Sequence, residues 1–193
     1  MKSPLGSSPT QWILAIGFTP FVVSIITTMG LVFLVGDRVP RVIAPGSSLV
    51  AAGLSVTLLT GLFPLTTMWL RWSEPLARRQ TILICGFAAL MSWPIWTMGV
   101  MPTVNGMRFG PVHSTAMRLI RQEIRHASRN PTIYHWAYLR PAAADSGLTA
   151  GRYFVPTADY DIWSGAPPRN IQVHHATGLL GAEILFSFHS RQS

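Results

Sequence analysis

The hydrophobic pattern divides the chain into two parts at Met107 and Arg108. Before this point, three long stretches contain no Asp, Glu, Lys or Arg. They lie between Lys2 and Asp37, between Arg41 and Arg71, and between Arg79 and Arg108. Each is longer than the about 20 apolar residues that cross a bilayer as a helix. After Arg108 charges recur at ordinary intervals, so the pattern predicts three transmembrane helices followed by a small, mostly β C-terminal domain.

The expected parts of the chain follow this pattern. In chain order they are an N-terminal tail at 1–11, a transmembrane helix at 12–35, a loop at 36–48, a second transmembrane helix at 49–70, a basic loop at 71–80, a third transmembrane helix at 81–101, and a small β-rich extramembrane domain at 102–193. No small-residue cleavage site follows the first apolar stretch, so we expect the first helix to remain uncleaved.

Prolines and small residues predict local features of these helices. Pro20 predicts a kink in the first helix, and Pro94, between two indoles in SWPIW, predicts one in the third. Small and hydroxylated residues in the second helix favour close approach to a neighbouring backbone. They are Ala52, Gly53, Ser55, Thr57, Thr60 and Gly61. Ser47 or Ser48 is the expected cap of this second helix.

Tryptophan and arginine mark the expected membrane boundaries. Indole rings favour the interface between lipid and water, and arginine side chains remain in the water beside it. The residues that we expect to anchor the helices there are Trp12, Trp69, Trp72, Arg71, Arg78 and Arg79.

The basic residues also predict an orientation. Three spans place the N terminus and the 71–80 loop on one side, and the 36–48 loop and the tail on the other. Charges in a long translocated domain have little influence on orientation, so those of the tail are discounted. The first side then has more basic residues, which are Lys2, Arg71, Arg78 and Arg79. We expect a cytoplasmic N terminus and a C-terminal domain outside.

Composition agrees with a membrane protein. Apolar residues make up 49% of the chain and charged residues 11%, whereas about 25% of residues in soluble domains are charged. The net charge of +8 comes almost wholly from arginine, because Lys2 is the only lysine. The arginines occur singly or in pairs and form no long basic run. We therefore expect their positive charge to attract anionic lipid head groups, and we expect no nucleic-acid partner. The single cysteine, Cys85, can form no internal disulfide.

The tail contains a succession of short strand signals. TIYHWAYL at 132–139 is aromatic and β-branched and is bounded by proline on both sides, which is typical of a strand. RYFV, NIQVH and EILFSF predict three further strands. TADYDIW predicts one helical turn capped by Thr157, and Gly178 and Gly181 predict a turn. The order of these elements predicts a small antiparallel β domain.

The segment MRLIRQEIR at Met117–Arg125 fits two structures. Met117, Ile120 and Ile124 form a helical stripe backed by arginines, which would suit a basic helix at the membrane interface. Alternatively, the segment pairs with TIYHWAYL through the turn signal HASRNP. We favour this hairpin.

Residues 152–181, RYFVPTADYDIWSGAPPRNIQVHHATGLLG, resemble the end of many uncharacterised bacterial inner-membrane proteins. In those proteins a few helices precede a compact β domain with a strand, a turn containing tyrosine, a second strand and a Gly-x-x-Gly close. The resemblance covers less than half of the chain. It implies this architecture and an inner-membrane location, but no activity, because such proteins share none. Pro167-Pro168 departs from the pattern, where a Gly-Asp turn is more frequent.

Six histidines are the residues that could build a metal site. The candidates are His135, His174 and His175, with Asp159 and Asp161 as further ligands. His174 and His175 are adjacent, and neighbouring residues of a regular strand point to opposite faces, so the two cannot both bind one metal ion. We expect surface or packing histidines and no metal site.

Catalytic motifs do not stand out either. The tail carboxylates are Glu123, Asp145, Asp159, Asp161 and Glu183. The Asp159-Tyr160-Asp161 run suits the first turn of a helix, and nothing resembles a nucleophile elbow or a serine paired with a base. We therefore expect no catalytic residues and no cofactor.

The expected function is that of a non-enzymatic integral membrane protein. It presents a small β domain to another protein, to a second copy of itself or to the membrane surface, with TIYHWAYL as an edge strand for docking. The alternative is an accessory subunit of a membrane transport or envelope complex. The lack of ionisable residues in the charge-free stretches counts against a transport path.

Overall fold

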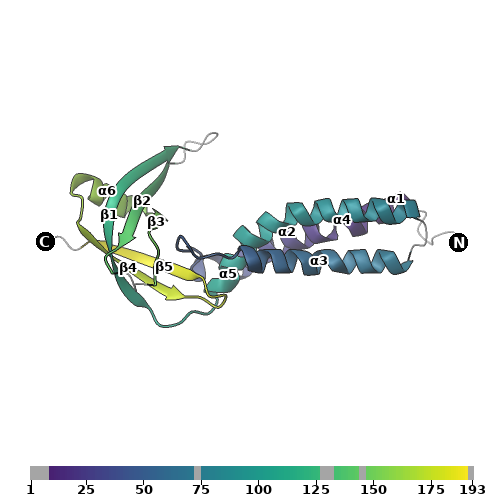
Figure 1. Ribbon diagram of the computed structural model, residues 1–193, viewed down its shortest axis with the longest axis horizontal. Helices are drawn as coiled ribbons and strands as arrows, with labels where there is room; N and C mark the ends of the chain where they lie inside the picture. Colours follow the sequence, from purple (N-terminus) through teal and green to yellow (C-terminus); the bar gives the residue numbers. More distant parts are fainter. Residues whose placement is uncertain (1–8, 72–74, 127–132, 144–146, 191–193) are drawn as a thin grey trace. The chain divides into compact units, whose positions relative to one another are not determined.

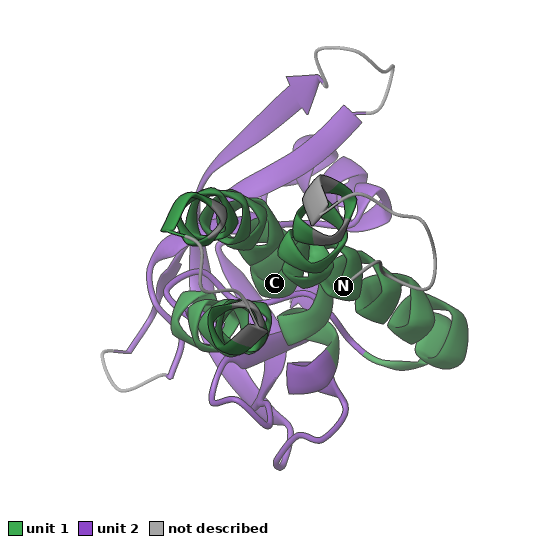
Figure 2. Ribbon diagram, turned by 90° about the vertical axis from the view of Figure 1, so that its right-hand side faces the viewer, with its two compact units in different colours: residues 1–39, 49–103 green, residues 40–48, 104–193 purple. Residues whose placement is uncertain are grey.

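The computed structural model of the chain describes residues 9–71, 75–126, 133–143 and 147–190. The chain forms two compact units (Figures 1 and 2). Unit 1, residues 1–39 and 49–103, is helical, and unit 2, residues 40–48 and 104–193, contains an antiparallel sheet. The predicted layout of helices followed by a small β domain is therefore present.

The helices of the first half overlap the charge-free stretches, and α4 also includes Arg78 and Arg79, which we expected in a basic loop. They are α1 (Pro9–Gly17), α2 (Thr19–Val35), the 3-10 turn η1 (Gly36–Arg38), α3 (Val50–Arg71), α4 (Pro75–Ile95), the π-helical turn η2 (Trp96–Val100) and α5 (Met101–Gly106). Among the described residues, two helical segments are long and apolar enough to cross a membrane, Val50–Thr67 and Arg78–Gly106. Thr19–Val35 is also apolar, but its 17 residues are fewer than the about 20 that a span needs.

Both prolines that predicted kinks coincide with changes in helical geometry. The first helix is interrupted at Phe18, immediately before the Thr19-Pro20 start of α2. In the third, the α-helix ends just after Pro94 and a π-helical turn follows, which closes with the Met101 N–H donating to the Trp96 carbonyl. A proline has no N–H to donate, so the regular ladder is broken locally in each case.

Close helix packing occurs at one of the small residues that predicted it. A Cβ atom on Gly53 of α3 would collide with the Thr97 hydroxyl and lie 3.0 Å from the Thr97 Cα. Thr57, one turn later, donates its hydroxyl to the Gly53 carbonyl at 2.8 Å. The missing side chain at Gly53 thus lets α3 approach η2 closely, as expected for helices that pack through small residues.

The β domain is a five-stranded antiparallel sheet with the strand order β3-β2-β1-β4-β5. In chain order its elements are β1 (His113–His126), β2 (Ile133–Pro141), β3 (Gly151–Phe154), α6 (Thr157–Gly165), β4 (Asn170–Thr177) and β5 (Glu183–Ser190). The hairpin of β1 and β2 is confirmed, and Met117–Arg125 is strand, not helix. The expectation that TIYHWAYL is an edge strand is wrong, because β3 pairs with β2 on its other side.

The core of the domain lies on one face of the sheet. Met117, Tyr153 and Ile171 are fully buried there, and Trp163 of α6 packs its ring edge-on against Phe188 at 5.9 Å between centroids. Helix α6 is longer than the single turn expected. Its N-cap is Pro156, so Thr157 is not the cap that the sequence predicted.

Residues 40–48, which we expected to be only a connection between two helices, belong to unit 2. The Leu185 N–H donates to the Val42 carbonyl at 2.9 Å, and the Ala44 N–H donates to the Glu183 carbonyl at 2.8 Å. The Ser47 hydroxyl accepts a hydrogen bond from the Glu183 N–H at 2.9 Å. The Ser47 side chain therefore binds the start of β5 instead of capping α3. This segment covers part of the β5 edge.

The predicted glycine turn between β4 and β5 is confirmed, and Asn105 holds it. The side-chain amide of Asn105 donates to the Ala182 carbonyl at 3.0 Å, and its oxygen accepts the Leu180 N–H at 2.9 Å. A Cβ atom at Gly178 would collide with Asn105, and Gly181 has a positive φ of 79°. Glycine is therefore needed at both positions.

Candidate functional site

Two single-residue bulges decide which side chains reach each face of the sheet. Leu119 pairs with Leu139 and the next pair is Arg121 with Tyr138, so Ile120 is left over in β1. A bulge exchanges the faces of all residues beyond it. Without it, Arg121 would continue the buried row of Met117 and Leu119. The bulge instead places the charged residues beyond Ile120 on the outer face.

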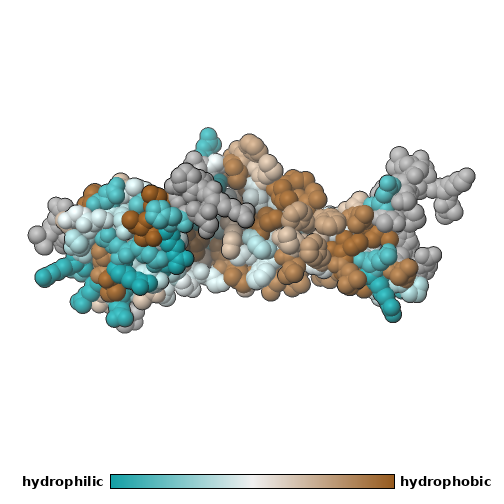
Figure 3. Space-filling model, turned by 90° about the horizontal axis from the view of Figure 1, so that it is seen from above, coloured by the Kyte–Doolittle hydropathy of each residue, from teal (hydrophilic) through white to brown (hydrophobic). Residues whose placement is uncertain are grey.

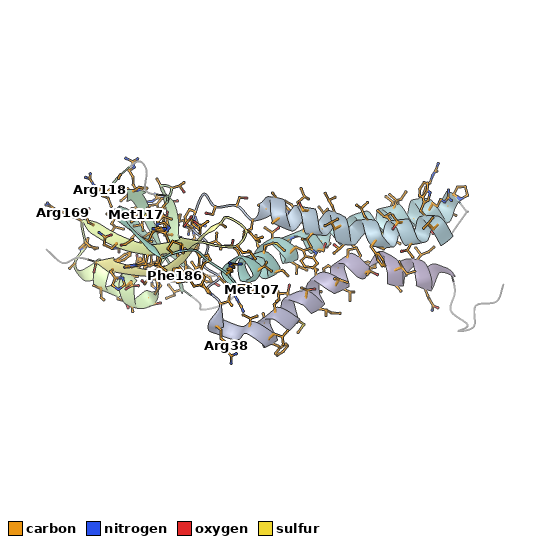
Figure 4. The ribbon with its side chains drawn as sticks, turned by 90° about the horizontal axis from the view of Figure 1, so that it is seen from below. Arg38, Met107, Met117, Arg118, Arg169 and Phe186 are labelled. Carbon is orange, nitrogen blue, oxygen red and sulfur yellow. The ribbon has the colours of Figure 1, made fainter. Side chains whose placement is uncertain are left out.

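The second bulge lies in β5. His174 pairs with Ser187 and His175 with Leu185, so Phe186 has no partner in β4. Beyond this bulge, Leu185 faces the core. Glu183 pairs with Thr177 and lies on the same face of the sheet as His175. Figure 4 labels Phe186, together with Met117, which is buried, and its neighbour Arg118, which is exposed. Both candidate sites described next depend on these bulges.

The first site is on the outer face, and we call it the arginine–aromatic face. It consists of Arg118, Arg121, Glu123, Arg125, Trp136, Tyr138, Arg140 and Arg152. Strands β1, β2 and β3 contribute to it at alternate positions, which is why residues far apart in sequence share it.

Glu123 lies at the centre of this face. Its Oε1 atom is 2.7 Å from Arg125 Nε and 3.5 Å from Arg152 Nη2, and its Oε2 is 3.9 Å from Arg121 Nη2. The hydrogen bond from Arg125 lowers the pKa of Glu123, and the positive charges of Arg152, Arg125 and Arg121 lower it further. One carboxylate is thus shared by three guanidinium groups.

Two of these guanidinium groups also stack on aromatic rings. Arg121 Cζ is 4.0 Å from the Tyr138 ring centroid, and Arg152 Cζ is 4.1 Å from that of Trp136. A cation over a ring face is stabilised by the ring quadrupole. The stacks hold the planar groups in fixed positions.

Arg118 and Arg140 add an unfavourable pair to the same face. They lie directly opposite each other on β1 and β2, and both are exposed. Like charges at opposed positions of a sheet destabilise it. Among the residues that the structure describes, no ion pair involves either side chain. The face therefore holds five arginines and one glutamate.

The second site, the His175 pocket, lies on the inner side of the sheet. His175 is 4% exposed, and its Nε2 is 2.9 Å from the Thr115 hydroxyl while its Nδ1 is 2.7 Å from Glu183 Oε2. The Thr177 hydroxyl donates to the other Glu183 oxygen at 2.6 Å. These residues border a cavity of about 500 Å³, which is also lined by His113, Ala142 and Gly147.

The histidines that the sequence singled out do not come together. His135 lies against Tyr160 of α6 with 4.5 Å between ring centroids, His174 is 4.9 Å from His189, and His175 is in the pocket just described. Asp159 lies in the first turn of α6, and burial raises its pKa. Within the described ranges no three His, Cys, Asp or Glu side chains are placed to hold a metal ion.

The expected anchors can be located in part. Arg78 Cζ lies 4.5 Å from the Trp69 ring centroid, so these two anchors form a cation–π pair. Trp12 is in α1, Arg71 is the last residue of α3, and Arg79 is exposed on α4. Trp72 lies outside the described residues.

Sequence reasoning missed both sites. Arg121, Glu123 and Arg125 are charged residues at every second position, and this period of two could have identified a charged strand face. Thr115, His175 and Glu183 carry no such signal, because the first two are 60 positions apart. Comparison of the chain with models of protein families, with curated proteins and with solved structures finds no match.

Proposed function

We propose that this chain is an integral membrane protein whose β domain binds an acidic segment of a partner protein through the arginine–aromatic face. The observation that carries the proposal is the opposed pair Arg118 and Arg140, next to three further arginines that share one carboxylate. A sheet that keeps like charges opposite each other without a local counter-charge is stabilised when an acidic ligand supplies one.

The exposed surface of unit 1 supports membrane insertion. Large apolar side chains such as Leu59, Phe63, Leu83 and Phe87 are mostly exposed on α3 and α4. Figure 3 shows predominantly hydrophobic surface over these helices and mixed polar surface over the β domain. Contact with lipid is favourable for such side chains, whereas contact with water is unfavourable.

The hydrogen bonding around Phe18 supports the proposal of three spans. The Phe18 N–H donates to the Leu14 carbonyl at 3.0 Å, and the Val22 N–H donates to the Phe18 carbonyl at 3.1 Å. These two hydrogen bonds thus bridge the local break between α1 and α2, and the two helices together exceed the about 20 residues that a span needs. With Val50–Thr67 and Arg78–Gly106 as the other spans, the N terminus is cytoplasmic and unit 2 is outside the bacterial inner membrane.

Orientation can be measured with cysteine labels. Replacing Cys85 by Ala and placing a single cysteine at Ser7 or Ser193 allows labelling with a reagent that does not cross the membrane. We expect Ser193→Cys to react from outside intact cells and Ser7→Cys to react only after the cells are opened. Labelling of Ser193→Cys only from the cytoplasmic side would reverse the orientation.

An acidic protein fits the face better than a lipid surface does. Arginine offers a planar fork that matches a carboxylate through two hydrogen bonds, and every basic residue of this face is arginine. Arginine, tyrosine and tryptophan are also the residues that dominate the binding energy of protein interfaces. Stacking on Tyr138 and Trp136 holds two guanidinium groups in place before binding, which reduces the entropy lost on association.

The test uses the whole chain in nanodiscs of neutral phosphatidylcholine and a fluorescent oligoglutamate peptide as the probe. We expect saturable binding that weakens with salt. Exposed ion pairs contribute about 0.5 kcal/mol each, so the double variant Arg121→Gln, Arg125→Gln should bind about fivefold more weakly. Arg38→Gln is the matched control, because Arg38 is an exposed arginine of unit 1 and is labelled in Figure 4.

Two outcomes contradict the proposal. One is equal loss of peptide binding in the Arg38→Gln control and in the double variant. The other is absence of peptide binding together with association of the β domain with nanodiscs that contain phosphatidylglycerol, which would identify the face as a lipid-binding surface.

A further inference from the structure

The hydrogen bonds of the His175 pocket have a defined direction. An ionised Glu183 can only accept, so the His175 Nδ1 atom carries the proton of the 2.7 Å contact. In the neutral imidazole the Nε2 atom then has a free lone pair, and it accepts the Thr115 hydroxyl proton over 2.9 Å. The chain of contacts therefore runs from hydroxyl to imidazole to carboxylate.

The carboxylate at the end of this chain is itself held in place. The Thr177 hydroxyl donates to Glu183 Oε1 at 2.6 Å, and the Glu183 backbone N–H donates to the Ser47 hydroxyl at 2.9 Å. The side chains of His175 and Glu183 are only 5% and 17% exposed. Hydrogen bonds in such a place are stronger than in water, and they fix the imidazole in one tautomer and one orientation.

The same groups border open space. Thr115, His175 and Glu183 line the cavity of about 500 Å³, together with the small residues Ala142 and Gly147. Gly147 has a positive φ of 73°, and a Cβ atom there would lie 3.6 Å from His175 Cε1. The volume falls in the range of sites that bind small molecules.

We infer that the His175 pocket is an acyl-transfer site for a small ester, with Thr115 as nucleophile and His175 as its general base. This activity is separate from the proposed interaction and uses the opposite face of the sheet. Glu183 is a positioning residue, because it acts on the substrate only through His175.

The reaction balances with these groups and water. The Thr115 Oγ atom forms a bond to the carbonyl carbon while its proton passes to His175 Nε2. The bond from the carbonyl carbon to the leaving oxygen then breaks, and that oxygen takes the proton from Nε2. Water attacks the threonyl ester in the same way, its proton moves through Nε2 to Thr115 Oγ, and the carboxylic acid is released.

The direct test is covalent labelling of the whole chain in detergent with an alkyl fluorophosphonate. This reagent traps an activated hydroxyl as a stable phosphonyl ester. Intact mass measurement followed by peptide mapping should place one adduct on Thr115. Thr115→Val has the same shape without the hydroxyl and should give no adduct, while Thr115→Ser should keep it.

Glu183→Gln tests the positioning role. A glutamine can donate its amide proton to His175 Nδ1, which leaves the proton on Nε2, so that Nε2 can no longer accept the Thr115 proton. By analogy with the loss seen when an orienting carboxylate becomes an amide, the labelling rate should fall at least about 100-fold. An unchanged melting temperature in this variant would show that the loss is not one of folding.

Three results would overturn the inference. The wild-type chain could remain unlabelled, the adduct could map to His113 or Ser114, or Thr115→Val could be labelled as fast as the wild type. In each case the network of His175 has only a structural role, and Thr115→Val should then simply lower the melting temperature.

Discussion

Arg121 lies directly opposite Tyr138 on neighbouring strands, with its guanidinium 4.0 Å from the ring centroid. This contact exists only because Ile120 is skipped in the pairing of β1 with β2. One exposed, unpaired residue thus directs the charges of β1 to the outer face. The same relationship exists in β5, where Phe186 directs Glu183 to His175.

Deleting Ile120, whose side chain is 59% exposed, should leave the β domain folded. The deletion places Arg121 directly after Leu119, so regular alternation keeps Leu119 opposite Leu139 on the core face and Arg121 opposite Tyr138 on the outer face. Ile120→Ala keeps the bulge and should change the free energy of unfolding by less than about 0.5 kcal/mol. Thermal unfolding compares the two variants, and a deletion variant that does not fold would contradict the pairing of Leu119 and Arg121 with consecutive residues of β2.

Arg140→Glu should stabilise the domain and weaken its binding to an acidic peptide. The substitution replaces a like-charge pair with Arg118 by an opposite-charge pair, which is worth roughly 0.2–1 kcal/mol across strands. Arg140→Gln removes the repulsion alone and should fall between the wild type and Arg140→Glu in melting temperature. A lower melting temperature for Arg140→Glu would mean that the opposed arginines are not a source of strain.

The stability that Glu123 contributes should disappear in acid. Its pKa is lowered in the folded chain, so its contribution is present above the ordinary glutamate pKa of about 4.3 and is lost as the pH falls below that value. The wild type should melt above Glu123→Gln at neutral pH, and the difference should shrink as the pH falls through the lowered pKa of Glu123. Because the group is exposed, about 1 M salt should also reduce the difference at neutral pH. A difference that is constant with pH would exclude a charge effect.

Gly53→Ala should destabilise the helical unit. The added methyl group would meet the Thr97 side chain and backbone, and overpacking of this kind costs about 1–3 kcal/mol. Gly86→Ala is the matched control, since a Cβ atom there has no neighbour within 4 Å. The melting temperature of each variant is measured in detergent from the loss of the helical circular dichroism signal on heating. Equal melting temperatures would argue against close packing of α3 and η2.

Local signals in the sequence predicted much of the fold. The aromatic and β-branched residues of TIYHWAYL and the prolines around them predicted β2, and Gly178 and Gly181 predicted the turn before β5. Long-range pairing was not predictable in this way. TIYHWAYL gives no sign that β3 covers it, and residues 40–48 look like any polar loop although their backbone pairs with β5.

The sites were less predictable than the fold, because bulges carry no sequence mark. The register shows that Ile120 is skipped, which places Met117 and Leu119 on one face and Arg121 on the other. From composition alone, the arginines look like scattered charges. Thr115, His175 and Glu183 meet only after three strands have aligned.

The central claim is that an acidic segment binds the outer face of β1 and β2, and hydrogen–deuterium exchange tests it most directly. The whole chain in phosphatidylcholine nanodiscs is compared with and without saturating oligoglutamate peptide. We expect slower exchange in residues 121–125 and 134–140 and no change in β4 and β5. Protection confined to the strands around His175, or none at saturating peptide, would contradict the claim.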